Sequence, residues 1–315
     1  MSLRLSSFSS SSRWCRIGML VLSMGATSLA AAQTSAAAPA AVAAAPTRLL
    51  VSHPVVAALT TALVRDTGIV VLRAAPESLP PNRQLAFFSG RGASALAEAA
   101  RQADAVIGLR SIWPDDPLFP LARRQNIRLI EIDAARPLDA SLPGMALQEQ
   151  AASANDLPWL DPVNLGRMAD VIAGDVARLV PAARPRLQTN VATLRQQVLA
   201  ITAQSEARLA TASNVAVFSL SDRLDYLVNG FNLDLAGTDA RADEAWTPEA
   251  LAELTKKLRS AAVSAVLHHR ELPAHVAQAV QQAGVKTIVL QTEGRDPIGE
   301  LRENSQRLGA IAATR

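Results

Sequence analysis

The fold is decided by residues 49–66, LLVSHPVVAALTTALVRD, in which a short apolar run is followed by a proline and a longer amphipathic stretch. Residues 49–52 predict a strand, and Pro54 is well placed to begin a helix that continues to about Asp66. The same order returns several times along the chain. Strands that alternate with helices in this way imply a parallel sheet with helices on its faces.

The repeats form two series, so the sequence predicts two α/β lobes. Strands of the first series are expected at residues 49–52, 69–73, 105–109 and 128–132, and its later helices at 93–103 and 117–124. A long loop is expected at residues 74–92, which are rich in proline and glycine. Strands of the second series are expected at residues 215–218, 233–236, 265–268 and 287–290, with helices at 222–229, 248–261, 273–283 and 297–312.

An almost purely helical stretch, residues 163–211, separates the two series. Its second helix begins near Pro185 and has apolar residues at helical spacing, namely Leu187, Val191, Leu194, Val198 and Ile201. The fold class is therefore α/β, with two parallel-sheet lobes joined by a long rigid helix. We expect a ligand in the groove between the lobes, where the carboxyl ends of parallel strands meet.

The N-terminus has the pattern of a secretory signal. Residues 1–32 combine three arginines, a short apolar run at 17–24 and the small residues Ala30-Ala31-Ala32. Residues 33–47 are nearly all Ala, Pro, Ser and Thr, as in a disordered tether. The domain boundaries that follow are 48–181 for the N-terminal lobe, 182–212 for the linking helix and 213–315 for the C-terminal lobe.

Composition excludes several classes of protein. A single cysteine, Cys15, excludes a disulfide or Cys-based zinc framework. Removal of residues 1–32 leaves 28 of the 31 basic residues against 28 acidic ones, so nucleic acid is not an expected partner. The sequence has neither a Gly-rich phosphate loop nor a G-x-S-x-G elbow, and we expect no enzymatic activity.

The heptapeptide Asp156-Leu157-Pro158-Trp159-Leu160-Asp161-Pro162 resembles the His-x-Trp-Leu-Asp-Pro signature of the periplasmic zinc/manganese solute-binding proteins of ABC importers. The similarity continues through the helical stretch and the second series. It is carried there by Asn164, Met168, Ala169, Pro181, Asn190, Asp222, Tyr226 and Thr247-Pro248. The resemblance covers the chain from Arg48 to its end and implies the same two-lobed fold.

The metal ligands of that family are replaced in this sequence. The resemblance implies three histidines and one carboxylate, which fall at Gln84, Leu157, Ser221 and Glu293. Leucine cannot donate to a metal, and the amide and hydroxyl groups are poor ligands for zinc.

Other residues offer an alternative metal site. His53 ends the first strand and His268-His269 end a later one, so His53, one of the pair and Glu293 would give three ligands. Consecutive strand residues point to opposite faces, so at most one of the pair can face a given ligand, and we take His268. The alternative is that these histidines bond only to loop backbone. Arginines at positions 83, 91, 110 and 223 could instead hold an anion, or lie on the surface.

The resemblance implies a monomeric periplasmic binding protein that delivers zinc or manganese to an ABC permease in the inner membrane. The metal would be the transported ligand, with no catalytic cofactor. Two alternatives stay open: the same fold could bind a non-metal solute or a metal chelate, or it could serve as an accessory or regulatory protein that has lost the metal site.

Overall fold

The structure is a computed structural model that describes residues 45–139, 142–147 and 156–312. The expected signal segment, residues 1–32, and all but the last three residues of the expected tether lie outside the described residues. None of the helices in the described part combines the length and apolar character needed to cross a bilayer.

The first α/β unit is built on a four-stranded parallel sheet in the order β2-β1-β3-β4. Leu49 on the central strand β1 is opposite Val71 on one side and Ala105 on the other. Both β1 and β3 are buried, because helices cover the two faces of the sheet. The strands are β1 (Arg48–Val51), β2 (Val70–Arg73), β3 (Ala105–Gly108) and β4 (Ile130–Asp133).

The second α/β unit repeats this arrangement with the order β6-β5-β7-β8, again parallel throughout. The register shifts between Val217 and Phe218, where β5 pairs with β6. Gly237 accommodates the Phe218 ring there, since a Cβ at position 237 would lie 2.8 Å from it. The strands are β5 (Ala216–Ser219), β6 (Asp234–Thr238), β7 (Ala265–His268) and β8 (Lys286–Val289).

The helices agree with the sequence prediction except in residues 74–92. That stretch, expected to be a loop, contains the 3-10 turn η1 (Pro81–Arg83) and the helix α2 (Gln84–Ser89). Its prolines suggested a loop, but Pro81 occupies the first position of a helical turn, where its missing N–H costs nothing. The remaining helices of the two units are α1 (Pro54–Leu63), α3 (Ala93–Gln102), α4 (Leu118–Arg123), α7 (Asp225–Gly230), α8 (Pro248–Ala261), α9 (Ala274–Gln282) and α10 (Pro297–Leu308), with a 3-10 turn η4 (Asp243–Ala245).

The connection between the units is the spine, which we define as α5 (Pro162–Leu179), η3 (Pro181–Ala183) and α6 (Arg184–Leu209). All five apolar residues predicted to face inward on α6 are buried. Asn190 on α6 donates from Nδ2 to the carbonyls of Leu63 and Arg65, 2.7 and 2.9 Å away, and so caps the end of α1. This bond gives a physical role to an asparagine that the family resemblance had singled out.

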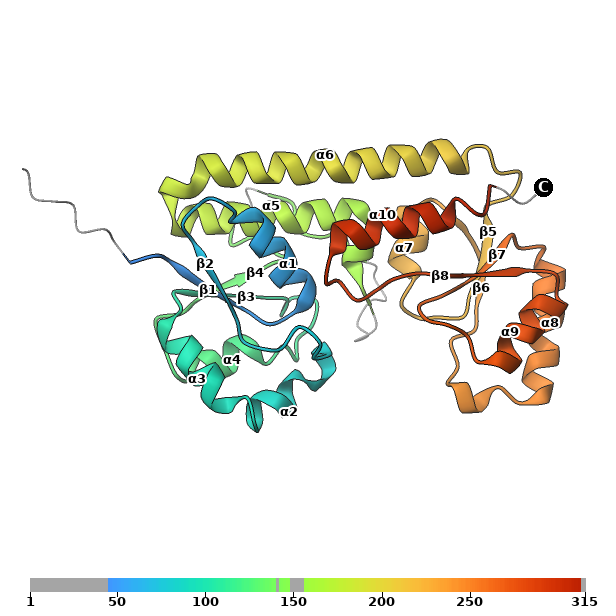
Figure 1. Cartoon of the computed structure of the whole chain (residues 1–315), viewed down its shortest axis with the longest axis horizontal. Coiled ribbons are helices and arrows are strands. Elements are labelled where there is room, and N and C mark those ends of the chain that lie inside the picture. The colour runs from blue at the N-terminus through green and yellow to red at the C-terminus, as the bar shows by residue number, and fades with distance from the viewer. Residues whose placement is uncertain (1–44, 140–141, 148–155, 313–315) are drawn as a thin grey trace, which may run out of the picture. The chain divides into compact units, whose positions relative to one another are not determined.

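One apolar core extends through both units and the spine. A single buried cluster includes Leu49 and Ile107 from the first sheet, Val217 and Leu267 from the second, and the inward side chains of α5 and α6. Helix α10 packs against α6 and also contacts α1 of the first unit, as Figure 1 shows. The two parallel sheets and the long connecting helix confirm the expected fold class, while the boundaries at 181 and 212 stay a prediction.

Candidate functional site

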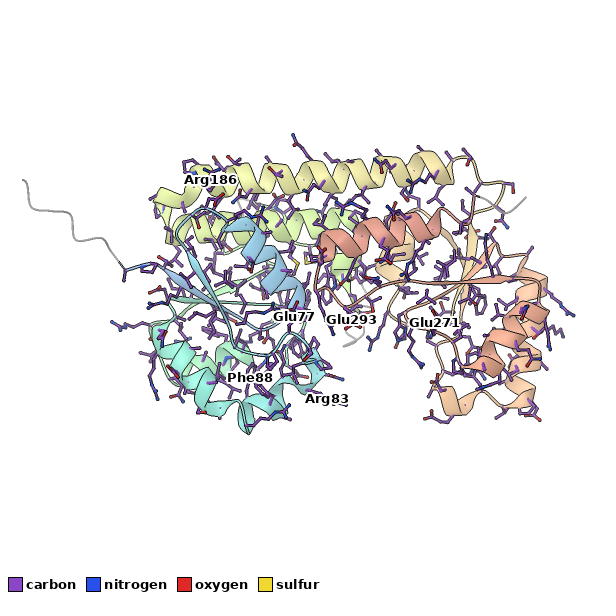
Figure 2. The ribbon with its side chains drawn as sticks, in the orientation of Figure 1. Glu77, Arg83, Phe88, Arg186, Glu271 and Glu293 are labelled. Atoms are coloured by element: carbon purple, nitrogen blue, oxygen red, sulfur yellow. The ribbon has the colours of Figure 1, made fainter. Side chains whose placement is uncertain are left out.

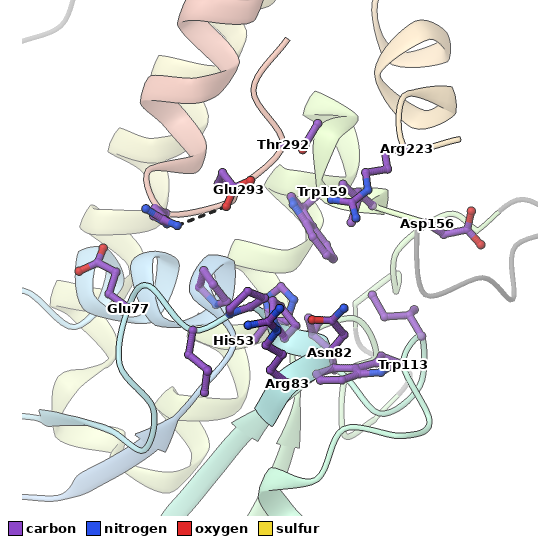
Figure 3. A pocket seen from close by; sticks show the side chains of 18 of the residues that line it. His53, Glu77, Asn82, Arg83, Trp113, Asp156, Trp159, Arg223, Thr292 and Glu293 are labelled. Carbon is purple, nitrogen blue, oxygen red and sulfur yellow. Dashed lines mark hydrogen bonds and ion pairs between the residues drawn. The ribbon is translucent and has the colours of Figure 1, made fainter. Parts of the chain in front are cut away.

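A pocket of about 400 Å³ opens at the carboxyl ends of the parallel strands. Its first wall comes from the loops that follow β1, β2 and β3, and it carries His53, Arg83 and Trp113. Its second wall carries Trp159, Arg223 and Glu293 from the segment before α5 and from the loops after β5 and β8. Figure 3 shows the two groups of side chains facing each other across the pocket.

His53 lies at the base of the pocket because β1 ends two residues before it and Pro54 begins α1 directly after it. Its ring meets those of Trp159 and Trp113 edge to face, with centroids 4.9 and 6.0 Å apart. Only 5% of the residue is exposed, and no protein group satisfies Nδ1 within the described residues. Burial lowers the pKa of His53 to about 3, so the imidazole is neutral at physiological pH.

Trp159 forms the opposite wall and is positioned by the turn η2 (Pro158–Leu160). Asp161 ends this turn and caps α5, its carboxylate accepting the backbone N–H of Val163 at 2.8 Å. The indole Nε1–H of Trp159 is buried without an acceptor among the described residues. Leu157 also lines the pocket and presents only an aliphatic side chain to it.

Glu293 reaches the pocket through a loop that α10 holds in place. The buried carboxylate of Glu300 on α10 accepts the backbone N–H groups of Gly294 and Arg295 at 2.8 and 2.9 Å, and that of Asp296 at 3.4 Å. The Glu293 side chain is 64% exposed and forms an ion pair with Arg295 at 3.4 Å. The sequence analysis did not identify Glu300. The pattern that could have indicated it is an acidic residue in the first turn of the last helix.

Two of the positions at which the family has histidines do not line the pocket, namely Gln84 and Ser221. Gln84 is buried at the start of α2, and its Nε2 donates to the carbonyl oxygen of Ser52 at 3.1 Å. Ser221 is buried after β5, with its Oγ 2.8 Å from Nδ1 of His269. Of the four family-equivalent positions, the structure thus brings Leu157 and Glu293 to one pocket.

His268 lies away from the pocket, against its own loop. Its Nδ1 is 2.7 Å from the carbonyl oxygen of Arg270, and its ring stacks on that of His269 with centroids 4.5 Å apart. The expectation that the two rings face opposite ways is wrong, because β7 ends at His268 and strand alternation no longer applies to His269. Burial is the main cause that lowers the pKa of His269 to about 4.

The three proposed metal ligands are not gathered in this structure. His53 and Glu293 line the same pocket, whereas His268 does not. Across residues 45–139, 142–147 and 156–312, no three His, Cys, Asp or Glu side chains lie close enough together to hold a metal ion. A three-ligand site built from His53, His268 and Glu293 therefore stays a prediction that needs rearrangement.

The arginines proposed to hold an anion divide into two groups. Arg83 and Arg223 line the pocket. Arg110 instead pairs with Glu131 at 3.0 Å, and Arg91 lies over the ring of Phe87 at 5.4 Å. Glu77 and Glu293 also line the pocket, and Figure 2 shows Arg186 far from both of them and from Arg83, on α6.

Comparison with known proteins gives one family and one fold. The sequence profile of the family described as zinc-uptake complex component A, periplasmic (ZnuA), matches residues 96–307. No curated protein matches the chain.

Three solved structures with the same fold are distant in sequence. A mutant of FpvC from Pseudomonas aeruginosa is 17% identical with a TM-score of 0.67, over 85% of this chain and 100% of that one. A periplasmic metal-binding protein from Candidatus Liberibacter asiaticus is 12% identical with a TM-score of 0.62, over 84% and 99%. A crystal structure of ZnuA is 17% identical with a TM-score of 0.62, over 85% and 99%.

Proposed function

Because the chain belongs to the family of the periplasmic zinc-uptake complex component A, we propose that it is the solute-binding component of an ABC importer for a divalent metal, zinc or manganese. The observation that carries this proposal is the placement of an imidazole and a carboxylate in one pocket at the carboxyl ends of the strands. His53 and Glu293 line it and offer a neutral imidazole and a carboxylate, which suit these metals.

The spine determines how such a protein can respond to its solute. One apolar core extends through both units, so a large separation of the lobes would expose buried side chains of α5 and α6. We therefore expect small movements of the pocket loops on binding. The solute shifts the protein toward the bound form only by the difference between its affinities for the two forms.

The partner of the bound form would be a permease in the inner membrane. A single copy of the chain contains both walls of the pocket, so a monomer is sufficient for binding. The cleaved N-terminal segment predicted from residues 1–32 would place the mature protein in the periplasm, with its role limited to capture and delivery and no catalysis.

Metal uptake by cells tests this proposal. Cells of the source organism that lack the gene should accumulate less zinc or manganese at limiting supply, and the wild-type gene should restore uptake. The variant His53→Ala should restore it poorly, whereas Glu271→Gln, a control at an exposed carboxylate outside the pocket lining, should restore it fully. Unchanged accumulation of both metals in the deletion strain would contradict the proposed function.

A further inference from the structure

Two guanidinium groups enter the pocket without a carboxylate partner in the part of the chain that the structure describes. Arg83, at the end of η1, and Arg223, between β5 and α7, come from opposite walls, as Figure 3 shows. No ion pair involves either side chain within the described residues. Guanidinium groups bind carboxylates through two parallel hydrogen bonds, so the two arginines offer a place for an anion.

The carboxylates of the same pocket are already engaged. Glu77 pairs with Arg73 at 3.6 Å, and Glu293 pairs with Arg295 at 3.4 Å. Asp156, the third acidic residue of the lining, also has an interaction of its own. A bare divalent cation would therefore compete with existing partners for its ligands while lying near two positive groups.

Two buried side chains in the pocket walls carry unpaired polar atoms. Trp159 and His53 are 7% and 5% exposed, and neither the indole N–H nor the imidazole Nδ1 has a protein partner within the described residues. Leaving a buried polar group unpaired costs about 1–3 kcal/mol, so such atoms are usually satisfied in the functional state. Both atoms have no accessible surface in this structure, so a solute reaches them only when the pocket loops move.

The size of the pocket also favours a molecule over an ion. Small-molecule sites in proteins have volumes of roughly 300–1,000 Å³, and this pocket has about 400 Å³. Leu157 in the lining gives aliphatic surface where the family resemblance implies a histidine. These features suit the carbon skeleton of an organic solute.

We propose that the pocket binds a small polycarboxylate, free or as its complex with a divalent metal, and that Arg83 and Arg223 bind its carboxylates from opposite walls. Trp113 and Trp159 enclose the carbon skeleton. This inference rests on the proposed function and names the chemical class of the solute that the pocket binds. In the metal complex the polycarboxylate supplies most of the metal's ligands, which explains why the chain does not need the three family histidines.

Calorimetric titration of the metal-stripped mature chain, residues 33–315, tests the inference with three probes: zinc, citrate and zinc citrate. We expect citrate or zinc citrate to bind at least about tenfold more tightly than zinc alone.

The arginine variants test the two guanidinium groups. Loss of a charged hydrogen-bond partner weakens binding about 10- to 100-fold, and we expect this for Arg83→Ala and for Arg223→Ala. Arg83→Lys should recover only part of the affinity, because an ammonium group binds one carboxylate oxygen at a time. Arg186→Ala, an exposed arginine of the spine, is the matched control and should leave binding unchanged.

The outcomes separate this inference from the proposed function. Tight binding of zinc alone that survives both arginine variants overturns the inference and leaves metal import standing. Binding of zinc citrate but not citrate supports both. Equal binding of citrate with and without zinc supports the inference and contradicts metal as the solute. Binding of none of the three probes overturns the inference, and the uptake experiment then decides the function separately.

Discussion

The neutral imidazole of His53 makes a quantitative prediction about acid stability. The pKa of His53 is about 3 in the folded protein, compared with an ordinary value of 6.5. Between these two pH values the unfolded chain binds a proton at His53 and the folded chain does not. Stability contributed by this group is therefore complete above pH 6.5 and is lost as the pH falls toward 3.

The size of the effect follows from the pKa difference. Each pH unit below the unfolded pKa removes about 1.4 kcal/mol until the folded pKa is reached. Moving from pH 7.5 to pH 5 should therefore cost the folded state about 2 kcal/mol through His53 alone, with roughly 5 kcal/mol as the limit near pH 3. Because burial is the cause of the shift, removing the titrating ring should remove this loss.

The variant His53→Phe isolates the contribution, because phenylalanine keeps an aromatic ring between Trp113 and Trp159 and cannot be protonated. Urea unfolding of both proteins at pH 7.5 and pH 5 gives the two free energies of unfolding. His269, whose pKa is also lowered, titrates in both proteins and so cancels in the comparison. The variant should lose about 2 kcal/mol less than the wild type. Equal losses in the two proteins would refute the assignment of a buried, neutral His53.

Four further substitutions test the loops and the spine by urea unfolding at neutral pH. Gly294→Ala should destabilise by about 2 kcal/mol, because φ is +69° and the new Cβ would lie 3.1 Å from Val55. Gly284→Ala, with φ +78° but no atom within 4 Å, should cost only about 1 kcal/mol. Glu300→Ala should cost about 2–4 kcal/mol and weaken solute binding, since backbone N–H groups in the pocket loop lose their acceptor. Asn190→Ala should cost about 1–2 kcal/mol without altering solute affinity, because it uncaps α1 far from the pocket lining.

Each of these results has an opposite that would contradict the structure. If Gly294→Ala and Gly284→Ala cost the same, the close approach of the loop to α1 is wrong. A Glu300→Ala variant with normal stability would mean that the carboxylate does not hold the pocket loop. Weakened solute binding in Asn190→Ala would mean that the spine acts on the pocket.

The strands and the spine were predictable from the sequence because their burial leaves a periodic pattern. The apolar runs at residues 49–52 and 265–268 and the helical spacing from Leu187 to Ile201 reflect contacts that every such element must make. The helix α2 was missed, since the prolines that precede it signal a break when read locally. Its position depends on packing of Phe88 into the first unit, which no local pattern reveals.

The candidate site was predictable in part. His53 and Glu293 each follow a strand. Because the carboxyl ends of parallel strands meet at one edge, both were expected in the groove, and both line the pocket. The same rule failed for His268, because the chain turns after β7 and the ring bonds to its own loop. Whether Arg83 and Arg223 have acidic partners depends on contacts between distant loops, so only the structure distinguishes them from Arg110.

The most direct test of polycarboxylate binding is a crystal structure of residues 33–315 grown with zinc citrate, with anomalous scattering measured at the zinc absorption edge. We expect a zinc peak inside the pocket, with citrate carboxylates bound to Arg83 and Arg223. A zinc peak held only by protein side chains, or one located at His268 and His269 outside the pocket, would contradict polycarboxylate binding.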